Sequence, residues 1–450
     1  MIELTKIFKS SKLMISDFKN IFAIGLPLVF NNLSSIAVNV GDTLMVARFS
    51  ENHLAAIAIG TGVWITLFLF GLGLIMAISP LVAQYFGAKN FKELKSVTSQ
   101  GFILATLIAL IVFIVMRNVL PAYLWFGIEP NIAELAQSYL LGLSFGVFPA
   151  FYYHLLKQVS EGLGRTVPIL IVMLCCLPIN LTLNYLLIFG GLGIPALGAM
   201  GCGIGSGIVF WIMFFLLFIY SKFFSMNRNM YGNFFPRYFD LVRFKKTAKL
   251  GYPIGVSLCL QTGLFSILTL MVGKLGTIQA AAHQIVLNYS GLVFMLPLGL
   301  SMAITVCVGQ FAGRGEFPVA RRLAFHGILL CFGLSIVTAF VTYLCPVWIS
   351  SIYTSDPEIQ KLAIPLLKLS AMVQVGDAMQ TSAAFALRGL KDTKIPMILN
   401  FFNYWIVGFT ISYVLGMQLG YGTVGIWIGL IIALFFASAC LIARLFCFRK

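Results

Sequence analysis

Long apolar stretches, separated by short polar connections, run along almost the whole chain. Only 10% of its 450 residues are charged and the mean hydropathy is +0.97, whereas a soluble domain carries about 25% charged residues. About 20 consecutive apolar residues are enough for a helix to cross a bilayer. The sequence therefore predicts an all-α integral membrane protein with twelve transmembrane helices, at approximately residues 21–45, 54–84, 98–120, 132–158, 166–190, 196–221, 248–273, 280–310, 320–347, 358–387, 394–417 and 421–445.

The net charge of +16 is divided unevenly between the two sides of the predicted membrane. If the N-terminus is cytoplasmic, all but five of the 30 Lys and Arg residues fall on the cytoplasmic side. The exceptions are Arg48, Arg117, Lys274, Lys361 and Lys368. This distribution follows the positive-inside rule, so we expect both termini to be cytoplasmic. Basic residues placed in this way contact anionic lipid headgroups, so membrane lipids are expected partners and nucleic acid is not.

Several functional classes leave no trace in the sequence. The nine cysteines show no spacing typical of a zinc or redox site, and the first 20 residues lack a signal-peptide cleavage site. No Gly-rich phosphate loop indicates ATP binding, no loop carries a catalytic set of side chains, and no channel filter motif is present. We therefore expect no enzyme, no cofactor and no removable signal peptide.

The chain repeats itself with a shift of 226 residues. Gly25 and Pro27 of the first predicted helix correspond to Gly251 and Pro253 of the seventh. Each repeat contains six predicted helices, so both repeats start on the same side of the membrane and are parallel, an arrangement that places substrate sites between the halves. We expect a cytoplasmic segment at 1–20, an N-lobe at 21–220, a basic cytoplasmic linker at 221–247 and a C-lobe at 248–450, with the lobes around a central cleft.

Two acidic residues, Asp42 and Asp377, fall deep inside predicted transmembrane helices, one in each repeat, and the other acids fall in loops or at helix ends. A carboxylate in the bilayer interior is costly and normally faces a cavity or an ion path. Because no Lys or Arg falls deep in any predicted helix, each acid must bind a proton, a metal cation such as Na⁺, or a cationic substrate. Asp42 and Asp377 are therefore the candidate cation-coupling residues.

Neutral polar residues accompany both acids at helical spacing, so that they share a helix face. Further polar residues that can line an inward face are Asn180, Asn184 and Gln261 on other predicted helices, and candidate cavity residues are Asn39, Gln284, Asn288, Gln374 and Thr381. Such residues also join transmembrane helices through hydrogen bonds, and the pattern leaves both roles open. Pro27 and Pro253 interrupt helices and are candidate hinges. We expect His283 to be a buried, hydrogen-bonded imidazole, and His326 to lie in a loop or at an interface.

The ordered set of motifs resembles the multidrug and toxic compound extrusion (MATE) family, and within it the NorM-type branch. The resemblance covers essentially the whole chain and rests on residues 41–43 with Met45, 80–87, Asn180 with Asn184, 281–284, 287–288, 377–378 and 387–389. It implies antiport, in which an organic cation leaves in exchange for H⁺ or Na⁺ while two lobes alternate access. It also implies functional roles for Asp42 and Asp377, with Asn180 and Asn184 beside Asp42 as candidate cation ligands. Together with the compact loops it favours a bacterial inner membrane, and we expect a monomer.

One position departs from the family pattern. Where NorM-type members commonly carry a glutamate in the seventh helix, this sequence has Gln261. A glutamine keeps a carbonyl ligand but removes one charge and one titratable proton, so a site made of Asp377 and Gln261 should hold Na⁺ weakly. We expect coupling to rest either on Asp42 with Asn180 or on Asp377 alone, with H⁺ slightly favoured over Na⁺.

A flippase for a lipid or lipid-linked sugar is the nearest alternative. Such a protein is expected to have a cavity rich in Arg and Lys for a pyrophosphate, and the predicted helices contain no such cluster. The substrate itself is not indicated by the sequence.

Overall fold

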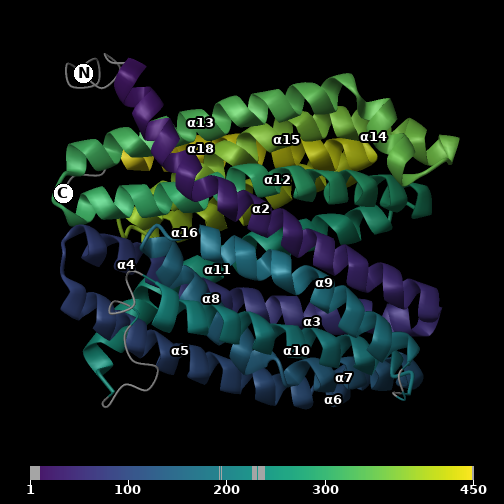
Figure 1. Cartoon of the computed structure of the whole chain (residues 1–450). Helices are drawn as coiled ribbons and strands as arrows, with labels where there is room; N and C mark the ends of the chain where they lie inside the picture. The colour runs from purple at the N-terminus through teal and green to yellow at the C-terminus, as the bar shows by residue number, and fades with distance from the viewer. Residues whose placement is uncertain (1–10, 192, 194, 226–230, 232–238, 448–450) are drawn as a thin grey trace. The chain divides into compact units, whose positions relative to one another are not determined.

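The computed structural model describes residues 11–191, 193, 195–225, 231 and 239–447, and nearly all of them are helical (Figure 1). The predicted all-α class is confirmed. The long helices are α2 (Ser11–Phe49), α3 (Glu51–Met76), α5 (Phe91–Arg117), α9 (Val167–Phe189), α10 (Gly198–Ile219), α11 (Leu241–Gly273), α12 (Thr277–Gly313), α13 (Phe317–Leu344), α15 (Pro357–Gly389) and α18 (Gly422–Cys447). The shorter ones are α4 (Ile78–Gly87), α6 (Leu120–Trp125), α7 (Pro130–Ser144), α8 (Val147–Gly162), α14 (Pro346–Tyr353), α16 (Lys394–Phe401) and α17 (Phe409–Tyr413), with π-helical turns at Tyr220–Phe224, Phe402–Gly408 and Val414–Gln418.

The described residues contain eleven helices long and apolar enough to cross a membrane, and a bent pair, α7 with α8, makes the twelfth. The predicted number of spans is therefore confirmed. The expected span 132–158 is not straight, because α7 and α8 meet at an angle of 52°. The break falls at Gly146, where an added Cβ would lie 2.5 Å from the Cα of Gly207. Glycine permits both the bend and this close helix contact.

The chain divides into two compact units, which we describe separately. The N-unit is Phe30–Gly255, and the C-unit consists of Met1–Val29 and Val256–Lys450. Residues 1–10 of the expected cytoplasmic segment, and 226–230 and 232–238 of the expected linker, lie outside the described residues. The divisions fall inside α2 and α11, so each of these helices contributes one end to each unit.

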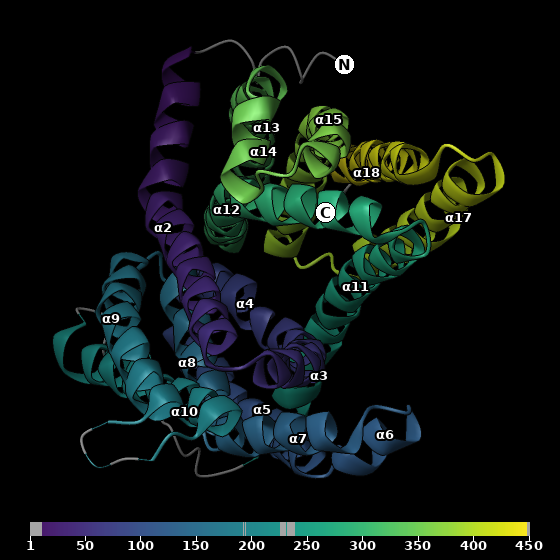
Figure 2. The same ribbon diagram turned by 90° about the vertical axis from the view of Figure 1, so that its right-hand side faces the viewer.

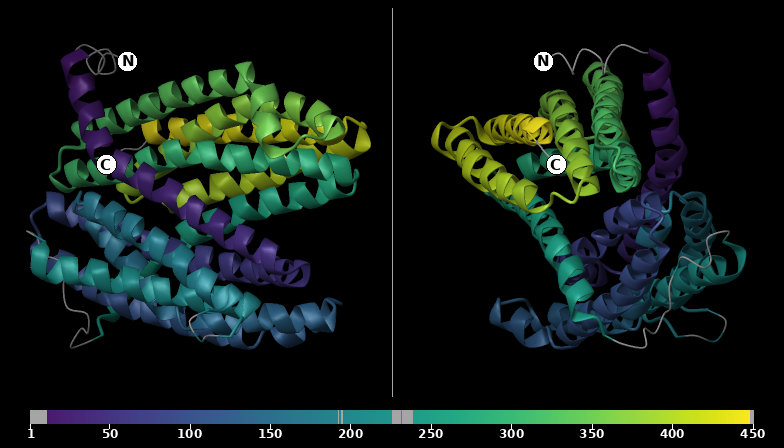
Figure 3. Two further views of the ribbon diagram at one scale, coloured as in Figure 1. Left: turned by 45° about the vertical axis from the view of Figure 1, so that its right-hand side comes forward. Right: turned by 90° about the vertical axis from the view of Figure 1, so that its left-hand side faces the viewer.

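In the N-unit, α10 packs against α7, α8 and α9, and α8 packs against α3, α4 and α5. Glycines on α10 bring the helices close together; a Cβ at Gly203 would collide with the backbone of α7 at Tyr139. Large side chains, including Trp64, Phe151 and Tyr153, fill the core of this unit. The two views of Figure 3 show these helices running side by side.

In the C-unit, α15 is the central helix and packs against α12, α13 and α18. Figure 2 looks along these helices and shows α15 between α13 and α18. Its residues from Ser370 onward are mostly buried. Trp427, Tyr404 and Leu434 belong to the core of the unit around it.

The repeat predicted from the sequence recurs as matching contacts in the two units. In the C-unit, a Cβ at Gly25 would lie 2.8 Å from the side chain of Leu300. In the N-unit, a Cβ at Gly251 would lie 2.7 Å from the Cα of Leu74. The two glycines are related by the 226-residue shift of the repeat, and so are the two leucines. Equivalent glycines therefore allow the first parts of α2 and α11 to pack closely against the helices that contain Leu300 and Leu74.

Pro27 and Pro253 occupy equivalent interior positions of α2 and α11. Each lies two residues before the point at which its helix passes from one unit to the other, after Val29 and after Gly255. A proline in a helix interior removes one backbone hydrogen bond and favours a kink. The chain thus has a built-in weak point at each of its two transitions between units.

Candidate functional site

Asp42 lies half-buried in α2, within the N-unit. The side-chain amide of Asn184, on α9, donates a hydrogen bond of 2.6 Å to Asp42 Oδ1. Ser206 on α10 is a second side-chain hydrogen-bond partner of the carboxylate. Asp42 has no ion-pair partner among the described residues. A short bond from a neutral amide orients the carboxylate without neutralising it.

Two amide oxygens on α9 are buried without hydrogen-bond partners among the described residues. Asn180 and Asn184 are 1% and 0% exposed, and neither Oδ1 accepts a hydrogen bond from any described residue. Leaving a buried acceptor unpaired costs about 1–3 kcal/mol, so such groups call for an explanation. Carboxylate and amide oxygens are ligands suited to hard cations such as Na⁺. The predicted association of Asn184 with Asp42 is present, and Asn180 lies one turn away on the same helix.

The close approach of α9 to α2 and α10 fixes this arrangement. Gly41, next to Asp42, leaves space for Leu181 of α9, since a Cβ there would lie 2.6 Å from Leu181 Cδ2. Gly205 of α10 leaves space for the amide oxygen of Asn184 in the same way. Any side chain at Gly205 would displace Asn184. Two glycines therefore bring three helices to the Asp42 carboxylate.

Asp377 lies in the C-unit on α15 and is 8% exposed. Gln261 donates to its Oδ1 over 3.5 Å and Thr381 donates over 3.4 Å, distances at the long limit for hydrogen bonds. Asp377 likewise forms no ion pair with a described residue. The expected pairing of Gln261 with Asp377 is present. A residue that sequence reasoning missed is Tyr404, whose buried hydroxyl has no hydrogen-bond partner among the described residues and which interacts electrostatically with Asp377.

A small cavity of about 20 Å³ opens beside Asp377. Its lining comes from α12, α13 and α15 and includes Ser290, Thr338 and Gln374. The hydroxyl of Ser290 is buried without a hydrogen-bond partner among the described residues. A polar cavity of this size holds one water molecule or a small ion. Gln374 is itself fixed by a 3.1 Å bond to Thr342.

The candidate cavity residues fall into two groups. Gln374 and Thr381 are buried at 7% and 6% exposure and lie near Asp377. Asn39, Gln284 and Asn288 are exposed. Two of the five residues are thus buried at the Asp377 site, and the other three lie on open surfaces of α2 and α12.

The prediction for His283 is confirmed, because its ring is buried and hydrogen-bonded at both nitrogens. Trp427 donates to Nδ1 over 3.1 Å, and Nε2 lies 3.2 Å from Thr269 Oγ1. Of the two alternatives for His326, the loop was wrong, since the residue lies within α13, and the interface is present where α13 contacts α2. His326 is 2% exposed, and its Nδ1 lies 2.7 Å from Asp17 Oδ2.

Asp17 is a buried acid that sequence reasoning placed in a terminal segment. It lies on α2, before Pro27, and is 4% exposed. Arg322 of α13 donates to its carboxylate over 3.0 Å, and His326 contacts the same oxygen. The i, i+4 spacing of Arg322 and His326 was the available signal for this cluster.

A second missed pair lies on α8. Lys157 and Glu161 are 6% and 2% exposed, with 4.0 Å between Nζ and Oε1. Lys157 lies at the end of the predicted span 132–158, where the sequence indicated a cytoplasmic side chain and gave no sign of its burial. In the first turn of α5, Glu93 pairs with Arg243 of α11, which also pairs with Asp240. Hydrogen bonds from Arg243 hold the pKa of Asp240 below its usual value.

Comparison with known proteins decides the family. The model of the MatE family matches residues 27–186 and 253–414. The chain belongs to the MatE family. The two matched ranges are the two repeats, and each contains one of the unpaired acids, Asp42 or Asp377.

Relatives of this MatE protein cover nearly its whole length. The probable multidrug resistance protein NorM of Shewanella oneidensis is 35% identical over 443 residues, covering 95% of this chain and 94% of the relative. The multidrug resistance protein MdtK of Cronobacter sakazakii is 32% identical over 434 residues, covering 95% of each. The NorM-type resemblance is confirmed by these matches.

Solved MATE structures share the fold. The eukaryotic MATE transporter AtDTX14 superposes with a TM-score of 0.87 at 19% identity, covering 97% of both chains. The Vibrio cholerae transporter VcmN, solved in a bent form, gives a TM-score of 0.85 at 17% identity, covering 96% of this chain and 97% of that one. This MatE protein is thus a multi-pass membrane protein with the MATE fold.

Proposed function

We propose that this protein is a secondary active multidrug efflux transporter, which exports organic cations in exchange for H⁺ or Na⁺ by alternating access. The names of its NorM and MdtK relatives support multidrug efflux. The single observation that supports cation antiport most directly is the Asp42 carboxylate, which has a neutral amide donor and no cationic partner among the described residues.

The Asp42 carboxylate can exist in two states. When it is ionised and empty, it attracts a cation from the transported class of compounds. When it binds H⁺ or Na⁺, it loses that attraction, so drug and coupling ion compete for one charge. A tenfold difference in ion affinity between two conformations corresponds to about 1.4 kcal/mol, so a modest change around the carboxylate suffices for coupling.

Asn180 and Asn184 supply the remaining ligands in this proposal. Their unpartnered amide oxygens are available to a metal cation held by Asp42, and protonation of Asp42 needs neither of them. We assign coupling chiefly to Asp42 with Asn184, and a secondary ion-binding role to Asp377 with Gln261 and Thr381. The weaker contacts of Asp377 support this order.

Pro27 and Pro253 are the hinges of the proposal. Each lies two residues before its helix leaves one compact unit, so bending there changes the direction of the following half-helix. A change in the charge of Asp42, fifteen positions after Pro27 on α2, can then be converted into movement of that helix. We place the protein in a bacterial inner membrane as a monomer, with both termini cytoplasmic and no cofactor.

Ethidium efflux from proteoliposomes tests the proposal. A pH gradient and a Na⁺ gradient are imposed separately on wild type, Asp42→Asn and Asp377→Asn. Glu134→Gln and Glu358→Gln are matched controls, because each removes one carboxylate from an exposed helix position in the same unit as the acid it controls.

We expect that one of the gradients drives efflux, that Asp42→Asn loses this efflux, and that both controls keep it. If neither gradient drives efflux from correctly folded wild type, cation antiport is contradicted. A lipid or lipid-linked substrate would then be tested next, with a flippase assay in the same liposomes.

A further inference from the structure

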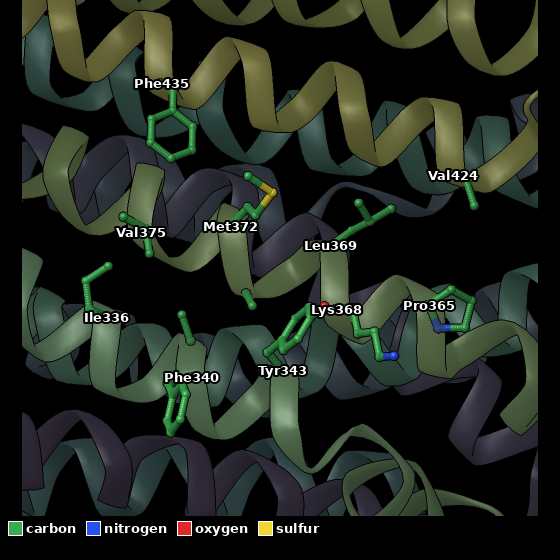
Figure 4. Close-up of a pocket in the computed structure, with 12 residues that line it drawn as sticks. Ile336, Phe340, Tyr343, Pro365, Lys368, Leu369, Met372, Val375, Val424 and Phe435 are labelled. Carbon is green, nitrogen blue, oxygen red and sulfur yellow. The ribbon is translucent and has the colours of Figure 1, made fainter.

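An open apolar groove runs along the surface of the C-unit between α13, α15 and α18. It has a volume of about 760 Å³. Figure 4 shows it extending from Pro365 and Val424 at one end to Ile336 and Val375 at the other. The remaining lining residues are Ala339, Phe340, Tyr343, Lys368, Leu369, Ala371, Met372 and Phe435. The groove contains no acid and takes no part in the Asp377 site.

The other residues that the structure describes leave this groove uncovered. Phe340, Tyr343 and Met372 are 63%, 56% and 53% exposed. The three helices that form the groove are each long and apolar enough to span a membrane. In a bilayer, the molecules that reach such a surface are lipids, unless another protein covers it.

The length of the groove matches one leaflet. Pro365 and Val375 are ten residues apart on α15, which corresponds to about 15 Å along a helix. The hydrocarbon core of a bilayer is about 30 Å thick, so one leaflet occupies about 15 Å. An acyl chain anchored at the Pro365 end would therefore lie along the groove as far as the middle of the membrane.

Lys368 is the basic side chain in the lining, and it lies near the Pro365 end (Figure 4). Its Nζ lies 5.6 Å from the centre of the Tyr343 ring, so a cation–π contact holds the ammonium group at the groove. Lys368 is exposed and forms no ion pair with any described residue. An exposed lysine within a membrane-spanning helix extends its charge toward the headgroups.

We propose that this groove is a binding site for an anionic diacyl phospholipid of the leaflet at the N-terminal end of α15. One acyl chain lies between α13, α15 and α18, and the phosphate of the headgroup contacts the ammonium of Lys368. Charge distinguishes this site from ordinary contact with lipid, because a single basic side chain meets the end of a groove of leaflet length. The site is independent of the antiport proposed above.

Native mass spectrometry of the delipidated full chain in detergent tests this assignment. Phosphatidylglycerol and phosphatidylcholine with identical acyl chains are titrated against wild type, Lys368→Gln, Lys361→Gln and Met372→Trp. Lys361→Gln is the matched control, since it removes the same charge from an exposed position of α15 outside the groove. Met372→Trp enlarges an exposed side chain inside the groove and leaves the charge in place.

Wild type and Lys361→Gln should bind phosphatidylglycerol about five-fold more tightly than phosphatidylcholine, the effect of one basic residue near a membrane surface. Lys368→Gln should lose that preference, and Met372→Trp should weaken binding of both lipids. A photoreactive acyl chain on phosphatidylglycerol should label peptides of α13, α15 or α18.

Three results would overturn the proposal. The first is an equal loss of preference in Lys361→Gln and Lys368→Gln, which would indicate general surface charge. The second is labelling confined to other helices. The third is a loss of groove photolabelling that increases with protein concentration and not with added lipid. That result would make a second copy of the chain the occupant.

Discussion

The two ends of α2 carry one acid each, and the two acids are held in opposite ways. Asp17, before Pro27, is buried in the C-unit between Arg322 and His326. Asp42, after Pro27, lies in the N-unit with hydrogen bonds from Asn184 and Ser206 and no cationic partner among the described residues. An acid that is paired with a cationic side chain of the protein stabilises one conformation of the protein. An acid without such a partner remains available to a mobile cation.

The largest effect is expected from removing the charge of Asp42. Asp42→Asn keeps the size of the side chain and should reduce gradient-driven ethidium efflux about 100-fold or more, equivalent to ~2.7 kcal/mol. Its thermal stability in detergent should stay close to that of wild type, because no ion pair is lost. Reduced efflux accompanied by an equally large loss of stability would remove the contrast between the two acids.

Replacement of Asp17 should have the converse effect. Asp17→Asn leaves Arg322 and His326 without their carboxylate, and breaking a buried ion pair is strongly destabilising. Because the Arg322 side chain is 21% exposed and reaches water, we expect a loss of about 2 kcal/mol, measured as a lower melting temperature. The efflux rate per folded molecule should remain near that of wild type. A coupling defect in this variant would show that Asp17 is more than a structural residue.

The sequence was sufficient for the number of spans, the repeat and the two unpaired acids, because each depends on hydropathy or on spacing along one helix. It was insufficient for Asp17 and Glu161, since an acid near a predicted helix end is equally compatible with water and with a protein interior. The bend at Gly146 was also missed, because the glycine there is needed for contact with Gly207, more than 60 positions away. Burial of Gln374 and exposure of Gln284 depend on packing that no single-helix pattern specifies.

The hydrogen bond from Asn184 can be tested separately from the charge that it contacts. Asn184→Ala removes a donor to an ionised acceptor, which is worth about 1.5–3 kcal/mol. We expect efflux at limiting ethidium to fall about tenfold, less than in Asp42→Asn. Asn180→Ala is the matched variant on α9, because the hydrogen bond to Asp42 comes from Asn184 and the proposed contribution of Asn180 is its amide oxygen alone. Equal losses in both variants would indicate that the amide oxygens matter more than the donated bond.

Gln261→Glu tests the comparison at the second unpaired acid, Asp377. It places a second carboxylate next to Asp377, where the present contact is 3.5 Å long. We expect the Na⁺ concentration for half-maximal efflux to fall about five-fold, because two negative charges attract the ion more strongly than one. Unchanged Na⁺ dependence would mean that the Asp377 site does not take part in ion coupling.

Thr381→Ala should have the smallest effect. Its hydroxyl donates to Asp377 over 3.4 Å and also to Gln380 over 3.3 Å, so neither bond is strong. We expect a change of about two-fold or less in the efflux rate. Thr381→Ser, which keeps the hydroxyl, is the control. If Thr381→Ala lowers the efflux rate as much as Asn184→Ala, ion coupling takes place mainly at Asp377 in the C-unit.

The central claim is that drug and coupling ion compete for the Asp42 carboxylate, and ethidium binding to the detergent-solubilised protein tests it most directly. Fluorescence titrations at pH 6 and pH 8, with and without Na⁺, should show that wild type binds ethidium more weakly in acid or in Na⁺. In Asp42→Asn, binding should be weak under all conditions and independent of both ions, whereas Asp377→Asn should keep most of the dependence. An unchanged dependence on pH and Na⁺ in Asp42→Asn would contradict the account.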